Sequence, residues 1–138
     1  MSSTKIAFAM CGSFCTFSKA LPQAQQLKEK GYDIIPIMSQ NASATDTRFG
    51  LAKDFIEKLE KISEKKLINS IKDAEPLGPK NMCDAMVIAP CTGNTLAKLC
   101  NGITDTSVTM AAKSLLRVGK PIILALASND ALGISAQN

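Results

Sequence analysis

Residues suited to binding a phosphate follow three apolar segments of this sequence. They are Gly12 and Ser13 after Lys5 to Met10, Ser39 after Asp33 to Met38, and Thr92 to Thr95 after Ala85 to Ala89. Hydroxyls, small side chains and the free backbone N–H groups at a helix start together bind anions. Ser and Thr are also ordinary helix N-caps, which is the simpler explanation of any one loop. Three such loops at one sheet edge favour a phosphate site.

Such a site does not need an arginine. Each hydrogen bond to a charged group contributes about 1.5–3 kcal/mol, whereas a helix dipole contributes about 0.3–2 kcal/mol. Several N–H and hydroxyl donors can therefore hold the phosphate. The first loop has Gly12 alone rather than G-x-G-x-x-G, and no P-loop motif occurs. The pattern thus disfavours dinucleotide dehydrogenases and P-loop enzymes and favours a ligand with a phosphate and a flat apolar body.

The elements that position these loops alternate between strand and helix. Near-continuous apolar runs predict strands buried on both faces at Lys5–Met10, Asp33–Met38, Ala85–Ala89 and Pro121–Ala127. Apolar residues with helical spacing fill the gaps, in patterns that run from Phe17 to Leu27, Leu51 to Ile62, Leu96 to Ile103 and Val108 to Val118. This order predicts a parallel sheet with helices on both faces and ligands outside the carboxyl ends of its strands.

Two segments have more than one interpretation. Pro22 interrupts the first helical pattern, so that helix is either kinked or begins near Ala20 with Pro22 in its first turn. Leu67 to Lys80 contains two prolines and a glycine, and we expect an ordered loop that includes a short strand.

Composition excludes several functions. The net charge of +4 is dispersed, and five Phe and one Tyr do not interleave with basic residues, which argues against nucleic-acid binding. No apolar run reaches the length of a bilayer span and no signal peptide is apparent, so we expect a cytoplasmic protein without a membrane segment.

The five cysteines occur in a chain without histidine and form no C-x-x-C pair, so we expect no metal site. Buried, reduced thiols are the expected state. A redox role for Cys15 or Cys91 is a weaker alternative, since only a helix N-terminus is at hand to lower a thiol pKa.

The loops resemble a known family. Ala89 to Lys98 (APCTGNTLAK) is similar to the APxSANTxAK loop of the homo-oligomeric flavin-containing cysteine decarboxylases, and Gly12-Ser13 and Ser39 match the first two loops of that family. The resemblance covers essentially the whole chain. It implies a homo-oligomer with a three-layer Rossmann-like or flavodoxin-like α/β fold that binds FMN. The residues implied to bind FMN are Gly12, Ser13, Phe14, Ser39, Thr92, Gly93, Asn94, Thr95 and Ala127.

Further segments resemble more closely the branch of this family that the dipicolinate synthase B subunits form, among them Thr45 to Gly50 (TDTRFG) and Ala74 to Lys80 (AEPLGPK). This resemblance implies oxidation of a dihydrodipicolinate-type precursor to dipicolinate during sporulation, in the mother-cell cytoplasm. The partners would be a small dicarboxylate substrate and an A subunit that carries NADP or NAD. The candidates for a catalytic role are Arg48, Asn94 and Asn129, and Arg48 would clamp a carboxylate.

The departures from the family leave alternatives open. The decarboxylases use a histidine base, which this chain lacks, and Asn129 alone keeps the PAMN amide. An FMN-dependent decarboxylase is therefore one alternative, and a non-catalytic subunit with a vestigial phosphate pocket is another. We expect residues 1–138 to form a single domain that lacks the last strand and helix of the family, so that the sheet is truncated at its C-terminal edge.

Overall fold

The computed structural model describes residues 3–127. Four parallel strands form one sheet in the order β2-β1-β3-β4. They are β1 (Lys5–Met10), β2 (Asp33–Met38), β3 (Ala85–Cys91) and β4 (Ile122–Leu126). The strand predictions are confirmed, with β3 extending two residues past Ala89 and β4 starting and ending one residue inside its predicted range.

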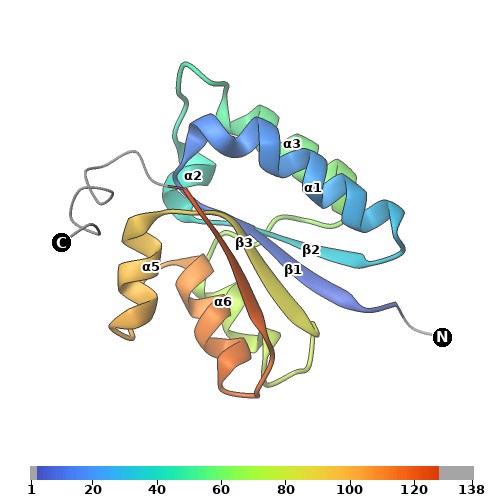
Figure 1. Cartoon of the computed structure of the whole chain (residues 1–138), viewed down its shortest axis with the longest axis vertical. Coiled ribbons are helices and arrows are strands. Elements are labelled where there is room, and N and C mark those ends of the chain that lie inside the picture. The colour runs from blue at the N-terminus through green and yellow to red at the C-terminus, as the bar shows by residue number, and fades with distance from the viewer. Residues whose placement is uncertain (1–2, 128–138) are drawn as a thin grey trace.

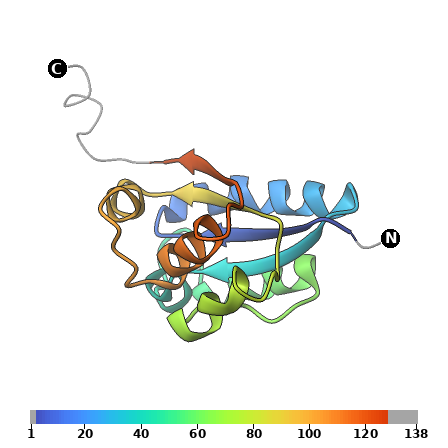
Figure 2. The same ribbon diagram turned by 90° about the horizontal axis from the view of Figure 1, so that it is seen from below.

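Helices cover both faces of the sheet (Figures 1 and 2). On one face lie α1 (Phe17–Glu29) and α3 (Ala52–Ser63), and on the other lie α4 (Ile71–Ala74), α5 (Gly93–Cys100) and α6 (Ser107–Leu116). Short helices η1 (Phe14–Thr16), α2 (Gln40–Ala44) and η2 (Glu75–Leu77) complete the connections. The prediction of a three-layer α/β fold is confirmed.

Alternation along β1 explains why its residues are apolar throughout. Ile6, Phe8 and Met10 pack in the core under α1 and α3, whereas Ala7 and Ala9 pack in the core under α6. A strand with helices on both faces has no side that solvent reaches, so both sets of side chains must be apolar.

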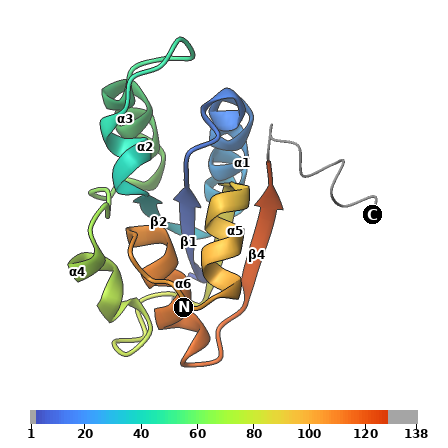
Figure 3. The same cartoon turned by 90° about the vertical axis from the view of Figure 1, so that its left-hand side faces the viewer.

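The last strand corrects the sequence prediction. Within residues 3–127, β4 pairs with β3 alone and forms an edge of the sheet (Figure 3). Ile123 is 60% exposed and Leu126 is 62% exposed, so β4 is not covered on both faces as its apolar run suggested. An apolar run looks the same in a strand that is covered by helices of its own chain and in a strand that is covered by another chain or segment.

Two local predictions also need correction. α1 starts at Phe17 and continues through Pro22, so it does not begin near Ala20. The 67–80 segment contains α4 and η2, and its pairing to the sheet is a single bridge from Ile68 to Ile37 in place of a strand. Pro76 lies in η2, where its fixed φ suits a tight helical turn.

Across residues 3–127, no helix combines the length and the apolar character needed to cross a bilayer.

Candidate functional site

The loops after β1, β2 and β3 meet at one cavity of about 540 Å³, which we call the loop cavity. It lies at the carboxyl ends of the strands, where parallel α/β sheets bind ligands. Its lining residues come from three loops, α2, α5 and the start of α6: Cys11, Gly12, Ser39, Gln40, Asn41, Thr92, Asn94, Thr95, Lys98, Asp105 and Thr106. The prediction that the three loops come together is therefore confirmed.

Five of the residues expected to bind FMN line this cavity: Gly12, Ser39, Thr92, Asn94 and Thr95. The others lie elsewhere. Ser13 precedes η1, Gly93 is the first residue of α5, and the Phe14 ring packs on Phe17 with centroids 5.3 Å apart. Ala127 lines a separate cavity of about 280 Å³ beside β4 and α1. That these residues contact a flavin stays a prediction.

Hydroxyl groups at the helix starts hold the loop cavity in shape. Ser39 caps α2 by accepting the Ala42 N–H at 3.1 Å. Thr92 caps α5 by accepting the Thr95 N–H at 3.2 Å, and its own hydroxyl donates to Thr95 Oγ1 at 3.1 Å. The N-cap explanation is therefore correct for Ser39 and Thr92, and both side chains also line the cavity.

A chain of hydrogen bonds continues from these caps into the core. The Thr95 hydroxyl donates to Cys11 Sγ at 3.3 Å, and the Cys11 thiol donates to the Pro90 carbonyl at 3.1 Å. Both Thr95 and Cys11 are buried. This chain links the α5 cap to the adjacent strand ends, so the floor of the cavity is fixed by side chains as well as by the backbone.

The start of α6 closes the cavity on the side of β2. The Ser107 hydroxyl donates to the Met38 carbonyl at 2.6 Å, and the Ser107 N–H donates to Gln40 Oε1 at 3.0 Å. Thr106 and Thr109 form a capping box there. These contacts join α6 to the end of β2.

The cavity has donors without a large net charge. Lys98 is the cation among its lining residues, and its ammonium group pairs with Asp105 at 2.9 Å. The first N–H groups of α5 have no intrahelical acceptor, and the positive end of the helix dipole lies there. An anion here would be bound by N–H and hydroxyl donors.

Cys11 has an altered acidity at the floor of the cavity. A hydrogen bond with Cys91 and others with Thr95 and Thr92 lower the pKa of Cys11 to about 6 from an ordinary 9.0, against the opposing effect of burial. The same interaction raises the pKa of Cys91. The redox role for Cys15 or Cys91 that the sequence left as a weaker alternative stays a prediction, and the thiol with the lowered pKa is Cys11.

Burial of the cysteines follows the sequence prediction in part. Cys11, Cys83 and Cys91 are buried, Cys15 is partly buried and Cys100 is exposed. Residues 3–127 contain no disulfide. In that same stretch, no three His, Cys, Asp or Glu side chains gather as a metal site would require.

Arg48 lies outside the loop cavity. It is exposed, and its guanidinium carbon lies 4.9 Å from the centroid of the Phe49 ring. The structure does not bring it to Asn94, and Asn129 lies outside the described residues. Its use as a carboxylate clamp stays a prediction.

Sequence reasoning missed six lining residues: Cys11, Gln40, Asn41, Lys98, Asp105 and Thr106. Gln40 and Asn41 directly follow Ser39, so the position of the second loop was the available signal. Asp105 and Thr106 lie in the loop between α5 and α6. The helical pattern of the sequence does not show that this loop leads back to the cavity.

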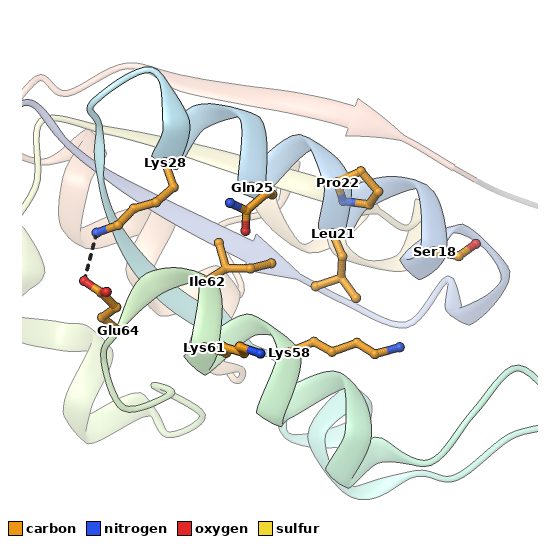
Figure 4. A pocket seen from close by; sticks show the side chains of 9 residues that line it. All are labelled: Ser18, Leu21, Pro22, Gln25, Lys28, Lys58, Lys61, Ile62 and Glu64. Atoms are coloured by element: carbon orange, nitrogen blue, oxygen red, sulfur yellow. Dashed lines mark ion pairs between the residues drawn. The ribbon is translucent and has the colours of Figure 1, made fainter.

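A larger cavity, of about 680 Å³, lies between α1 and α3 (Figure 4). Lys28, Lys58 and Lys61 surround it, and Lys28 pairs with Glu64 at 3.6 Å. It lies on the outer side of two helices and includes none of the loops that follow strands. We therefore do not assign the candidate site to it.

Comparison with known proteins gives the family. The sequence profile described as Flavoprotein matches residues 1–134. The B subunit of dipicolinate synthase from Bacillus subtilis (strain 168) is 43% identical over 134 residues, which are 97% of this chain and 67% of that protein. This chain thus spans about two thirds of that relative.

Solved structures agree with the fold. The B subunit of dipicolinate synthase from Bacillus halodurans superposes with a TM-score of 0.83 at 40% identity, covering 99% of this chain and 70% of that one. The FMN-dependent cysteine decarboxylase SpaF gives a TM-score of 0.72 at 22% identity, covering 94% and 71%, which supports the fold alone. From its profile match and its identity to the Bacillus subtilis protein, the chain belongs to the Flavoprotein family.

Proposed function

We propose that the loop cavity binds the phosphate of FMN and that the chain is the flavin-carrying B-type component of a dipicolinate synthase. The observation that carries this proposal is the convergence of Ser39, Thr92 and Thr95 at the carboxyl edge of the sheet, beside the start of α5. The two relatives named as B subunits of dipicolinate synthase suggest the reaction, and the match to the Flavoprotein profile supports a flavin cofactor.

The residues present fit a phosphate. Ser39 brings a hydroxyl and α5 brings free N–H groups. The Thr92 and Thr95 hydroxyls already donate to Thr95 Oγ1 and Cys11 Sγ, so they would have to turn to donate to a phosphate. The acidic residue of the cavity, Asp105, is neutralised by Lys98. The volume of about 540 Å³ is ample for a phosphate and the chain attached to it.

Each part of the site has a defined task in this proposal. Thr92 and the start of α5 hold the phosphate, and Asn94, exposed at the cavity, offers an amide to the cofactor or the substrate. Bound in this way, FMN would supply an electron acceptor for oxidation of the dihydro precursor. The protein then mainly orients the diacid, since formation of an aromatic ring already favours the oxidation.

The A subunit, with NADP or NAD, would be the partner, and the complex would act in the cytoplasm of the mother cell. The direct test is dipicolinate formation from the dihydro precursor by this chain and an A subunit, with and without FMN. The proposal predicts FMN-dependent product. Product formed equally well without FMN would contradict it and favour a non-catalytic role for this chain.

A decarboxylase is the second candidate, because the SpaF structure shares the fold. It predicts turnover of a carboxylate substrate by this chain alone. The absence of histidine removes the commonest general base and argues against it.

A further inference from the structure

A second cavity lies between α5 and α6, which are neighbours on one face of the sheet (Figure 3). It has a volume of about 440 Å³, within the range that holds small ligands. We call it the α5–α6 cavity. Its lining residues are Leu99, Gly102, Ile103, Thr104, Thr109, Lys113, Leu116 and Arg117.

The cations of this cavity have no acidic partner in the part of the chain that the structure describes. Lys113 lies on α6 and Arg117, four positions later, is the C-cap of that helix; among the described residues, no acidic side chain lines the cavity. Within residues 3–127, neither forms an ion pair. Like charges at this spacing repel each other on a helix. The negative end of the helix dipole is one explanation for cations near the last turn of α6. It does not explain why an apolar cavity lies beside them.

The rest of the cavity is apolar and partly open to solvent. Ile103 is 44% exposed and Leu116 is 59% exposed, and Leu99 completes the apolar wall. The Thr109 hydroxyl is already used, because it donates to the Thr106 carbonyl at 3.2 Å. A ligand that matches these groups has a carboxylate for the two cations and an apolar ring for the wall.

The position of the cavity connects it to the proposed flavin site. Thr104 lines the α5–α6 cavity, and the next two residues, Asp105 and Thr106, line the loop cavity. The capping box of α6 joins Thr106 to Thr109, one residue of each cavity. The two cavities therefore share one short segment as a common wall.

We propose that the α5–α6 cavity binds an aromatic carboxylate, with one carboxylate on Lys113 and Arg117 and the ring against Leu99, Ile103 and Leu116. Identifying this ligand as dipicolinate, the diacid product of the reaction, rests on the proposed function. The α5–α6 cavity would then be the place where that product binds. Arg48, which the sequence suggested for this task, lies outside both cavities.

The test is titration of the full chain with pyridine-2,6-dicarboxylate, followed by calorimetry and by backbone amide NMR. We expect shifts centred on Gly102, Ile103 and Lys113. Lys113→Met and Arg117→Met should each weaken binding roughly tenfold, since each removes a charge-assisted hydrogen bond. Methionine keeps helix propensity at these exposed positions, so the fold should persist.

Two controls complete the design. Lys72→Met removes an exposed cation from α4, outside the cavity, and should leave affinity unchanged. The neutral analogue pyridine-2,6-dimethanol should bind far more weakly than the diacid. Three results would overturn the inference. They are no binding of the diacid, binding by the Lys113 and Arg117 variants as tight as by the wild type, or amide shifts confined to residues of the loop cavity.

A parallel FMN titration separates this inference from the proposed function. A chain that binds FMN but not the diacid would refute the α5–α6 site alone. A chain that binds the diacid through Lys113 and Arg117 but takes up no FMN would refute the flavin proposal alone.

Discussion

At the scale of single residues, Thr92 links the shape of the loop cavity to its chemistry. It caps α5 by accepting the Thr95 N–H, and its hydroxyl donates to Thr95 Oγ1. The Thr95 hydroxyl donates in turn to Cys11 Sγ. One side chain therefore stabilises a helix start and lines the candidate anion site. The two effects can be separated by comparison with a cap elsewhere in the chain.

Thr92→Val should lower the free energy of unfolding by about 1 kcal/mol, the usual cost of a lost N-cap. It should also weaken FMN binding roughly tenfold, because the hydroxyl that positions the start of α5 at the cavity is lost. Ser70→Ala is the matched control: Ser70 caps α4 by accepting the Asp73 N–H at 3.2 Å and does not line the loop cavity. If both variants bind FMN as the wild type does, Thr92 has a structural role only. Urea unfolding and flavin fluorescence provide the two measurements.

The acidity of Cys11 predicts a pH dependence of stability. Its folded-state pKa of about 6 lies below the ordinary 9.0, so between these values unfolding takes up a proton and stability rises with pH. The slope is at most about 1.4 kcal/mol per pH unit. Above pH 9 the gain stops, and it is opposed because Cys91 and Cys83, whose pKa values are raised, resist ionisation in the folded state. Below pH 6 the contribution of Cys11 is lost.

Urea unfolding of the wild type and of Cys11→Ser from pH 6 to 9 measures this contribution. The difference in free energy of unfolding between the two proteins should grow with pH. Parallel curves would show that the Cys11 thiol does not ionise in the folded protein across this range.

At the scale of elements, η2 and α6 approach each other closely at Gly78. A Cβ at this position would lie 1.9 Å from the Ser114 carbonyl oxygen. The contact is tied by Ser114, whose hydroxyl accepts the Gly78 N–H at 2.7 Å and donates to the Glu75 carbonyl at 2.6 Å. The 67–80 segment is thereby fastened to the helix that closes the loop cavity.

Gly78→Ala should destabilise the protein by about 1–3 kcal/mol or more, because the backbone of α6 must move to admit the methyl group. Gly12→Ala is the steric control, since its Cβ would lie at an ordinary 3.6 Å from Thr92. Thermal unfolding compares the two. Equal melting temperatures for both variants would show that η2 does not pack against α6 as described.

The elements also show what the sequence could predict. All four strands follow from apolar runs, and α3 and α6 follow from helical spacing, because those patterns reflect burial directly. The contents of the 67–80 segment did not follow, since its short helices depend on tertiary contacts such as Gly78 with Ser114. The three loops of the site were predictable because strand ends meet at one edge. The ion pair between Lys98 and Asp105 was not predictable, because it depends on the path of the loop between α5 and α6.

At the scale of the whole molecule, the β4 edge is the largest departure from a closed fold. Ile123, Leu124 and Leu126 are all exposed on a strand whose outer edge is unpaired in the described sheet. Exposed apolar edge strands favour association. The homo-oligomer that the family resemblance implied would have a surface of this kind available.

We expect the 138-residue chain to self-associate through this edge. The double variant Ile123→Thr with Leu126→Thr keeps β propensity and should shift the chain toward monomer in sedimentation velocity. Leu51→Thr, at a residue that is 51% exposed on the α3 side, is the control and should leave the distribution unchanged. Identical concentration dependence for the double variant and the wild type would exclude β4 as the contact.

If the loop cavity holds the phosphate of a flavin, the chain must distinguish FMN from riboflavin, which has the same ring and no phosphate. Fluorescence titration of the chain should give one FMN site that is roughly tenfold or more tighter than that for riboflavin, as expected when several donors bind a charged group. Equal affinities for the two flavins, or no binding of either, would contradict the claim.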